Sequence, residues 1–275
     1  ANGPKILLVS DIHGTNLYPM MKQIITANHI DAVVDSGDLI NFGQTEELDI
    51  AGMRQGIESL GVPYLFVTGN HDSSAKDDRS LLAALATIPN VHLLQPKDDT
   101  YSIVSVDGVR VAGMNDLARW YGDDDIDTDS KQLPYAKQFN KAMKDQQPID
   151  LAVAHQSGAI KAMTVGVLRD YGHTHVSSFD GKAINPGTFS GGDPIRRAAQ
   201  LEAEQQPSSM AILSYDSTCT PTQLTRYAYT TRDNIPVLTS INIETITTTD
   251  TEVGKDRTCG SGGVSETSVA VVASK

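Results

Sequence analysis

The sequence predicts an α/β fold in which a parallel β-sheet is followed by a β-rich C-terminal region. Three continuous apolar segments, KILLVSD at 5–11, DAVVDSGD at 31–38 and VPYLFVTGNHD at 62–72, are typical of strands that are buried on both faces. Residues 16–30 and 45–61, which separate these segments, carry apolar side chains at helical spacing. Strands that alternate with helices at this spacing predict right-handed βαβ units.

The pattern changes after residue 90, where the predicted strands become short, alternating and closely spaced. A helix is expected near 131–146, and another buried strand at 149–158. No internal repeat and no linker interrupts the chain, so we expect one domain with a β-rich extension. The other expected elements are strands at 91–94, 100–108 and 109–116, a hairpin at 176–187, strands at 208–216, 223–230 and 239–247, and a loop at 259–266.

The chain is acidic, with a net charge of −12 over 275 residues and a pI of about 4.9. An acidic surface repels phosphate backbones and anionic lipids, so we expect no binding to long nucleic acids. No window approaches the roughly 20 apolar residues that a membrane-spanning helix needs. The chain begins at Ala1 without a signal-peptide pattern, and we expect a processed or trimmed N-terminus.

The chain has two cysteines, Cys219 and Cys259, and neither lies in a CxxC motif. They are either two free thiols in a cytosolic protein or one disulfide in an oxidising compartment. Residues 217–275 are rich in Thr and Ser and poor in Lys, which favours the second alternative. We therefore hypothesise that the two cysteines are bridged and that the protein works outside the cytoplasm.

The segment GDDDIDTDS at 122–130 carries five aspartates, and we interpret it as a solvated acidic loop. A calcium site is the weaker interpretation, because the glycine and the terminal glutamate of an EF-hand loop are missing.

Side chains suited to metal binding follow the buried strands. Sites in open α/β sheets form beyond the carboxyl ends of the strands. An isolated H-x-H pair such as His173 and His175 is a weak signal, but five of the seven histidines lie at strand ends, which indicates one common site. His29 and His92 lie elsewhere and are expected to be structural. The residues that end the strands are Asp11, His13, Asp38, Asn70, His71, Asp72, His155, His173 and His175.

These residue types favour a particular kind of metal centre. Carboxylate, imidazole and amide oxygen ligands suit divalent transition metals, and the lack of thiolates excludes copper(I) and iron–sulfur centres. The ligands are too many for one tetrahedral ion. Two ions roughly 3.5–4 Å apart that share a bridging carboxylate fit better, and such a pair activates water and stabilises an in-line displacement at phosphorus.

The ordered motifs D-x-H, G-D, G-N-H-D, H and G-H-x-H, which span residues 11–175, resemble those of the calcineurin-like metallophosphoesterase superfamily. The resemblance implies a four-layer α/β/β/α sandwich with a catalytic domain at 1–232. The Thr/Ser-rich extension at 233–275 matches no family that we recognise. The implied metal is Mn, Fe, Zn, Ni or Co. The implied ligands are Asp11, His13 and His175 for one ion and Asn70, His155 and His173 for the other, with Asp38 bridging.

The resemblance also implies catalytic roles. Asp38 would bridge the ions, and His71 would face the substrate, where it would stabilise the phosphoryl oxygens or protonate the leaving group. Protein Ser/Thr phosphatases of the superfamily carry G-D-Y-V-D-R-G where this chain has GDLINFG at 37–43. Asn41 thus replaces the Asp that would orient the catalytic histidine, and Phe42 replaces an Arg that would hold a phosphate dianion.

The segment INPGTFSGG after the last histidines is similar to the small bacterial and archaeal phosphodiesterases of the superfamily. We therefore expect a dinuclear-metal-dependent phosphoesterase, with phosphodiesters or small phosphorylated compounds favoured as substrates. A phosphomonoesterase, a protein phosphatase and a nuclease remain alternatives, and a non-enzymatic scaffold is the least favoured. Substrate choice is expected to depend on loops at 115–130 and 187–207.

Overall fold

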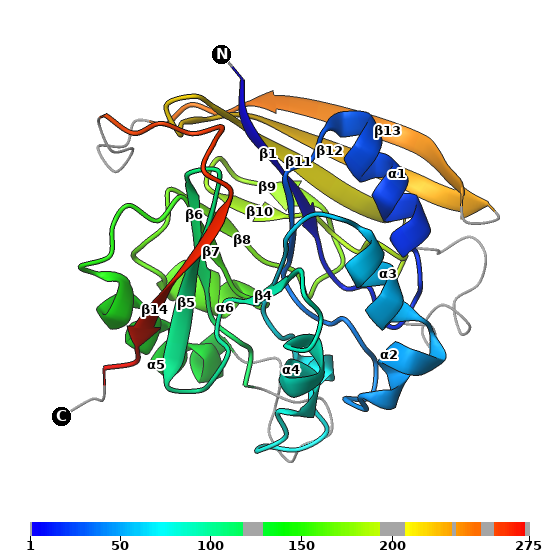
Figure 1. The fold of residues 1–275 in the computed structure, drawn as a ribbon, viewed down its shortest axis with the longest axis horizontal. Coiled ribbons are helices and arrows are strands. Elements are labelled where there is room, and N and C mark those ends of the chain that lie inside the picture. Colours follow the sequence, from blue (N-terminus) through cyan, green and yellow to red (C-terminus); the bar gives the residue numbers. More distant parts are fainter. Residues whose placement is uncertain (1, 118–128, 193–206, 233–234, 249–255, 273–275) are drawn as a thin grey trace.

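Two β-sheets packed face to face form the centre of the molecule, and helices cover both outer faces (Figure 1). The structure, a computed structural model, describes residues 2–117, 129–192, 207–232, 235–248 and 256–272. The arrangement confirms the expected four-layer α/β/β/α sandwich.

The first sheet contains the parallel strands that the apolar segments predict. Its central strand β1 runs parallel to β2 and antiparallel to β11. Strand β1 therefore has a neighbour at each side, since Leu7 pairs with Val33 of β2 and with Ile212 of β11. In order across the sheet, the strands are β13 (Ile235–Thr245), β12 (Pro221–Arg232), β11 (Ser208–Asp216), β1 (Asn2–Val9), β2 (Ala32–Asp35), β3 (Tyr64–Phe66) and β4 (Val91–Leu93).

The second sheet has a parallel centre formed by β6, β7 and β8. The antiparallel strand β5 and the predicted hairpin β9–β10 flank this centre. In order across the sheet, the strands are β14 (Val264–Ala270), β5 (Thr100–Val106), β6 (Val109–Gly113), β7 (Leu151–Val153), β8 (Leu168–Asp170), β10 (Ala183–Asn185) and β9 (Ser178–Phe179).

Three apolar cores hold the layers together. Successive side chains of a strand point to opposite faces, so Leu7 of β1 packs under the helices of the first sheet, whereas Leu8 packs between the two sheets. The third core lies between the second sheet and its two helices. The helices are α1 (Tyr18–Asn28), α2 (Glu46–Ile50), α3 (Met53–Ser59) and α4 (Ser80–Leu85) on the first sheet, and α5 (Asp129–Met143) and α6 (Ser157–Ala162) on the second.

Four local expectations were wrong. The helix expected at 45–61 is divided into α2 and α3, because Gly52 adopts a left-handed φ of 70° between them. The strand expected to reach residue 72 ends at Phe66, and Asn70–Asp72 form a short 3₁₀ turn. Strand β4 does not belong to the following meander but continues the first sheet, parallel to β3. The loop expected at 259–266 runs into β14, which pairs with β5.

The C-terminal segment extends both sheets. Strand β13 adds to the edge of the first sheet beside β12, and β14 adds to the edge of the second beside β5. The division of the chain at residue 232 remains a prediction. None of the helices in the described part of the chain combines the length and the apolar character needed to traverse a bilayer.

A disulfide joins Cys219 to Cys259, which confirms the hypothesised bridge. Cys219 lies in the turn between β11 and β12 of the first sheet, and Cys259 lies shortly before β14 of the second. Both side chains are buried in the core between the sheets. The bridge therefore ties the two sheets together.

Candidate metal centre

All seven predicted metal ligands lie shortly after strands that end at the site. Each ligand follows its strand by two to five residues, so its place depends on the sheet and on a short loop. Two groups of carboxylate and imidazole atoms result, with the ligand atoms of each group within 4.8 Å of one another. The first group consists of Asp11, His13 and His175, and the second consists of Asp38, His155 and His173.

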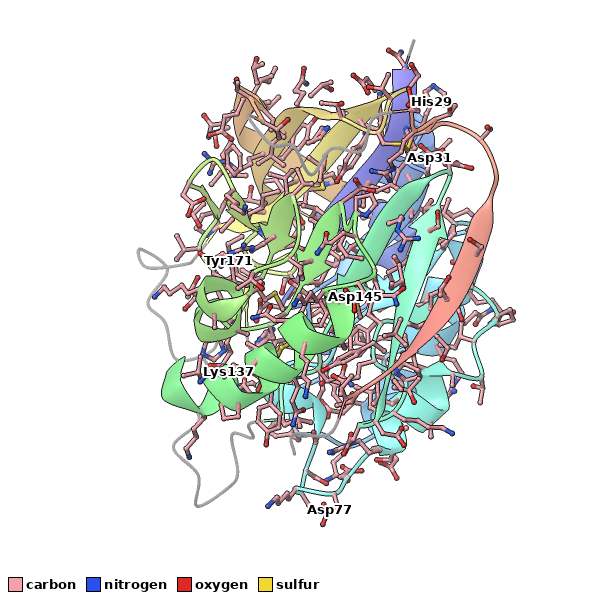
Figure 2. The ribbon with its side chains drawn as sticks, turned by 90° about the vertical axis from the view of Figure 1, so that its left-hand side faces the viewer. His29, Asp31, Asp77, Lys137, Asp145 and Tyr171 are labelled. Atoms are coloured by element: carbon pink, nitrogen blue, oxygen red, sulfur yellow. A yellow bond between two sulfur atoms is a disulfide. The ribbon has the colours of Figure 1, made fainter. Side chains whose placement is uncertain are left out.

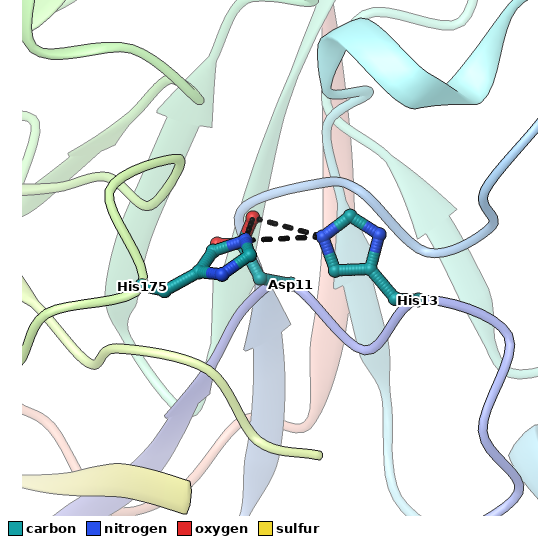
Figure 3. Close-up of side chains that lie close together, drawn as sticks. All are labelled: Asp11, His13 and His175. Carbon is teal, nitrogen blue, oxygen red and sulfur yellow. Dashed lines mark hydrogen bonds and ion pairs between the residues drawn. The ribbon is translucent and has the colours of Figure 1, made fainter. Parts of the chain in front are cut away.

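The first group converges on one carboxylate oxygen (Figure 3). Oδ1 of Asp11 lies 3.2 Å from Nε2 of His175 and 3.6 Å from Nε2 of His13. The two imidazole nitrogens lie 3.1 Å from each other. Possible donor atoms from the end of β1 and from the distant GHTH loop thus face one point.

The second group has the same character. Oδ2 of Asp38 lies 3.1 Å from Nε2 of His155. Nδ1 of His173 lies 3.1 Å from Oδ1 of Asn70, which brings the predicted amide ligand to the same place. The rings of His155 and His173 meet edge to face, with their centroids 5.2 Å apart.

Asp38 lies between the two groups. The Oδ2 atom that approaches His155 at 3.1 Å is also 3.7 Å from Nε2 of His13 in the first group. Its Oδ1 accepts a hydrogen bond from the main-chain N–H of His71 at 2.8 Å. One carboxylate oxygen is therefore held against His71, and the other faces both groups, as a bridging ligand requires.

Unsatisfied atoms in the site fit a cation. Oδ1 of Asp11 and Nε2 of His155 are buried and have no hydrogen-bond partner among the described residues. Leaving a buried polar atom unpaired is costly, and lone pairs that face one another repel. A metal ion at each group would accept these lone pairs, so the residues present fit two divalent ions.

The buried carboxylates of the site require positive charge beside them. Burial would raise the pKa of the Asp11 carboxyl, but the imidazoles of His13, His155 and His175 outweigh burial and hold that pKa well below its ordinary range. Burial lowers the pKa of His155, but the carboxylates of Asp38 and Asp11 outweigh burial and raise it well above the ordinary histidine value. Carboxylates this deeply buried require a cation beside them, either a protonated imidazole or a metal ion.

The loops that carry the predicted ligands are conformationally strained. Nine non-glycine residues of the described chain have a positive φ, and five of them are predicted ligands, with φ between 49° and 70°. A non-glycine residue in this region costs on the order of 1 kcal/mol or more, and such strain clusters at functional sites. These five predicted ligands are Asp11, His13, Asp38, His173 and His175.

Two glycines allow the carboxylates of two predicted ligands to approach the main chain. A Cβ atom on Gly172 would lie 2.0 Å from Oγ of Ser10 and 2.5 Å from Oδ2 of Asp11. A Cβ atom on Gly69 would lie 2.2 Å from Oδ1 of Asp38. The glycine of GHTH is therefore required because the loop closes on Asp11, whose Oδ2 accepts a hydrogen bond from the N–H of His173 at 3.0 Å.

The sequence interpretation assigned no role to two residues that hold the ligand loops together. The carboxylate of Asp72 accepts main-chain hydrogen bonds from Asp38, Ile40 and Gly69 at 2.9, 3.1 and 2.7 Å, and so joins the second and third strand ends. The amide of Asn185 donates to the carbonyl of Gly172 at 3.0 Å, which ties the INPG segment to the GHTH loop. Asp72 was visible as the last residue of GNHD.

His71 lies beside the predicted ligands, and a main-chain group fixes the orientation of its ring. Nδ1 of His71 lies 2.7 Å from the carbonyl oxygen of Asn41. A carbonyl oxygen can only accept, so Nδ1 carries the proton. The rings of His71 and His13 meet edge to face at 5.1 Å. The main chain of residue 41 thus orients the histidine, a function that the sequence comparison assigned to the side chain at this position.

Glu47 of α2 holds the loop that carries Asn41. Its Oε1 accepts a hydrogen bond from the N–H of Asn41 at 2.8 Å, and its Oε2 accepts from those of Phe42 at 3.0 Å and Gln44 at 3.2 Å. No sequence signal distinguished Glu47 from its acidic neighbours. The acidic segment 122–130, with its weaker calcium interpretation, lies outside the residues whose side chains the structure describes, as do large parts of the loops at 115–130 and 187–207.

The two histidines that were expected to be structural lie outside the site. His29 is exposed and ends α1, and His92 pairs with Glu266 of β14.

Comparison with known proteins identifies the family. A sequence profile described as calcineurin-like phosphoesterase matches residues 4–179, which is more than half of the chain. The chain belongs to the calcineurin-like phosphoesterase family. For a calcineurin-like phosphoesterase, the two Asp/His groups indicate a dinuclear metal site.

A short segment resembles a curated phosphodiesterase. Over 45 residues the chain is 49% identical to glycerophosphodiester phosphodiesterase GpdQ of Enterobacter lignolyticus. The matched segment covers 16% of this calcineurin-like phosphoesterase and 16% of that relative.

Two solved structures share the fold. A dimetal phosphatase from Danio rerio has a TM-score of 0.53 and 11% identity, with 90% of this chain and 100% of that chain covered. The protein TT1561 of Thermus thermophilus has a TM-score of 0.53 and 14% identity, with 77% of this chain and 94% of that chain covered. At these identities the comparison establishes the fold of the calcineurin-like phosphoesterase and nothing finer.

Proposed function

We propose that this chain is a dinuclear-metal-dependent phosphoesterase that hydrolyses phosphodiesters or other small phosphate esters. The observation that carries the proposal is the position of Asp38, whose Oδ2 faces a ligand group on each side, 3.1 Å from His155 and 3.7 Å from His13. We assign Asp11, His13 and His175 to one ion, Asn70, His155 and His173 to the other, and Asp38 to both.

The assigned ions would be two divalent transition metals from the series Mn, Fe, Zn, Ni and Co. Such a pair supplies Lewis acidity at phosphorus and an activated water. The residues of this chain hold the ions in place through strained loops that Asp72 and Asn185 tie together. This arrangement keeps the donor atoms in position before the substrate arrives, which reduces reorganisation during the reaction.

His71 is proposed to act on the substrate directly. Because Nδ1 donates to the carbonyl of Asn41, Nε2 is the ring atom that can exchange a proton with a leaving group or contact a phosphoryl oxygen. The ring is half-buried and lies edge-on to His13. His71 is thus proposed as a catalytic residue and not as a ligand.

The preference for diesters has two supports. Phe42 occupies the position where the protein-phosphatase branch carries an arginine, so a residue that would hold a phosphate dianion is missing at this position. The short segment that is similar to a glycerophosphodiester phosphodiesterase favours the same substrate class. The net charge of −12 argues against long nucleic acids.

The disulfide supports a proposed location outside the cytoplasm. A buried bridge such as Cys219–Cys259 forms and persists in an oxidising compartment.

A substrate panel tests the proposed function. Protein loaded with each metal of the series is assayed on bis(p-nitrophenyl) phosphate, p-nitrophenyl phosphate, a cyclic nucleotide and plasmid DNA, with His155→Ala as the inactive control. We expect the highest kcat/KM on bis(p-nitrophenyl) phosphate and no hydrolysis of the plasmid. Higher kcat/KM on the monoester would contradict the diester preference, and inactivity on every ester would contradict the enzyme.

A further inference from the structure

Strand β13 runs along the outer edge of the first sheet, where it is drawn in orange (Figure 1). It pairs with β12 on one side and has no strand on its other side among the described residues. Nine of its eleven residues are exposed. An edge strand with open N–H and C=O groups is a template for pairing with another chain. The free side of β13 is therefore a place where a further strand can add to the sheet.

One face of β13 carries a stripe of large apolar side chains. Leu238 and Ile241 lie opposite Tyr229 and Tyr227 of β12, so they point to the face of the sheet on which the helices pack. Ile243 continues the stripe two residues further on. The exposed fractions of the three side chains are 50%, 50% and 67%. A contiguous exposed apolar patch of this kind is typical of a protein–protein contact.

The main chain of Ile241 and Ile243 faces the free edge. The N–H of Ile246, which directly follows the strand, donates to the carbonyl of Thr222 at 3.0 Å and continues the register of the β12–β13 ladder. Hydrogen-bonded residues alternate along an antiparallel ladder. Within residues 240–245, the even-numbered residues therefore bond to β12, and the odd-numbered residues point their N–H and C=O groups away from it. The residues that carry the apolar stripe in this segment thus also carry the open main-chain groups.

Residues 240–245 lack the charges that usually protect an edge strand. Their one ionisable side chain, Glu244, is neutralised by Arg226 of β12, whose guanidinium donates to both carboxylate oxygens at 2.9 Å. Pro236 and the irregular register of the ladder interrupt only the first half of β13. Because the chain has a net charge of −12, two copies repel each other unless they meet where no net charge is exposed. Residues 240–245 meet this condition.

The same segment is complementary to a second copy of itself. In an antiparallel pair centred on Asn242, Ile241 of each copy lies opposite Ile243 of the other, so the open main-chain groups of both residues bond across the pair. The two apolar stripes then meet on one face of the joined sheet. On the other face, Ser240 lies opposite Glu244, so no carboxylate faces another carboxylate. A contact of this kind is isologous and closes into a two-fold dimer.

We propose that β13 pairs with β13 of a second copy of this chain and that the protein forms a two-fold dimer through this edge. The pairing joins the first sheets of the two copies into one continuous sheet. A specific interface buries about 800 Å² per partner, and a strand of this length spans about 37 Å, so a band about 20 Å wide along the strand reaches that area. Strand β1, which leads to the metal centre, lies three strands away from β13, so each copy keeps a complete set of assigned ligands.

Sedimentation velocity tests the proposed dimer. Wild-type protein at micromolar concentration should sediment with twice the 29.5 kDa mass of one chain. Ile243→Pro removes a donor at the free edge and leaves the ladder to β12 intact, and Ile241→Lys places a charge in the apolar stripe. Each variant should raise the dissociation constant of the dimer at least about tenfold. The matched control is Ile50→Lys at an exposed apolar position on α2, which should leave the dimer unchanged.

A cysteine at the two-fold axis tests the register of the pair. Both native cysteines are bridged, so Asn242→Cys introduces the one free thiol of the chain. In the proposed pair the two introduced thiols lie opposite each other, with a Cα separation that suits a disulfide. Mild oxidation should therefore give a covalent dimer on a non-reducing gel. The control is Lys137→Cys, at an exposed position on α5 over the second sheet (Figure 2), which should stay a single chain.

Three results would overturn the proposal. The first is wild-type protein that sediments as a monomer at every concentration. The second is a dimer that persists in both Ile241→Lys and Ile243→Pro, and the third is a dimeric protein in which Asn242→Cys forms no more covalent dimer than Lys137→Cys. Circular dichroism and metal content establish that each variant is folded. If Ile243→Pro does not fold, Ile241→Lys and Asn242→Cys decide the outcome.

Discussion

Nδ1 of His71 donates a hydrogen bond to the main-chain carbonyl of Asn41 across 2.7 Å. The side chain of residue 41 points elsewhere, since its amide donates to the carbonyl of His13 at 3.0 Å. An asparagine at this position therefore does not prevent orientation of the histidine. Where the protein-phosphatase pattern uses the side chain of this residue to orient the histidine, this chain uses the main-chain carbonyl of Asn41.

The first prediction concerns His71 itself. We expect His71→Ala to keep both metals and to lose on the order of 10²–10⁴-fold in kcat, because a proton-transfer or charge-stabilising group is removed. Across a series of aryl esters, a loss that shrinks with better leaving groups indicates general acid catalysis, and a uniform loss indicates charge stabilisation. His92→Ala, which lies outside the site, is the control. Loss of a metal ion in His71→Ala would contradict the assignment.

The second prediction makes Glu47 a positioning residue. Its carboxylate accepts three main-chain hydrogen bonds from residues 41, 42 and 44. We expect Glu47→Ala to lower kcat by about 10–10²-fold with unchanged metal content, because the carbonyl that orients His71 is released. The adjacent exposed Glu46→Ala should be silent. In a double-mutant cycle, adding Glu47→Ala to His71→Ala should cost nothing further, and additive losses would show that Glu47 acts by another route.

The third prediction concerns the disulfide. Cys219 and Cys259 close a loop of 40 residues, for which the chain-entropy model gives roughly 4 kcal/mol of stabilisation. Asn2 pairs with Asp216 beside the bridge, whereas the site lies at the other end of the eight-residue strand β1, which spans roughly 25 Å.

Reduction should therefore lower the melting temperature and leave two bound metals and kcat at 25 °C nearly unchanged. Thermal unfolding and metal analysis with and without reductant provide the measurement. Loss of metal on reduction would contradict this separation, and two alkylated thiols in freshly purified, unreduced protein would contradict the bridge.

The fourth prediction uses a buried carboxyl group at the end of β8. Asp170 is fully buried, and neither of its carboxyl oxygens has a hydrogen-bond partner among the described residues. Burial, reinforced by the charge of Asp35, raises the pKa of Asp170 well above its ordinary value. The folded protein thus keeps a proton that the unfolded chain releases above the ordinary aspartate pKa.

The free energy of unfolding should consequently fall as pH rises from the ordinary aspartate pKa toward the raised pKa of Asp170. For this one group the fall is about 1.4 kcal/mol per pH unit. Asp170→Asn removes that loss, so its melting temperature should exceed that of the wild type by a margin that grows between pH 4 and pH 7. The exposed Asp145→Asn is the matched control. A margin that does not change with pH, whatever its sign, would show that Asp170 titrates alike in the folded and the unfolded protein and would contradict the prediction.

The sequence predicted those parts of the fold and the site that depend on the pattern of side chains along the chain. The apolar segments at 5–11, 31–38 and 62–72 predicted both the central strands and the residues that gather at their ends. Strand β14 was missed because Val264–Ala270 is exposed at nearly every position and has no apolar periodicity, so only its pairing with β5 reveals it.

The sequence also did not predict the main-chain contacts of the site. The carbonyl of Asn41 orients His71, and Glu47 holds that carbonyl in place through amides, but neither role depends on a side-chain type that a motif records.

Metal content of Asp38→Asn tests the central claim most directly, because Asp38 is the one ligand assigned to both ions. Wild-type protein and the exposed control Asp145→Asn, purified without chelator and analysed by inductively coupled plasma mass spectrometry, should contain two metal ions per chain. Asp38→Asn should lose metal and activity together, because an amide cannot supply the bridging charge. Retention of both metals and of the full rate by Asp38→Asn would contradict the account.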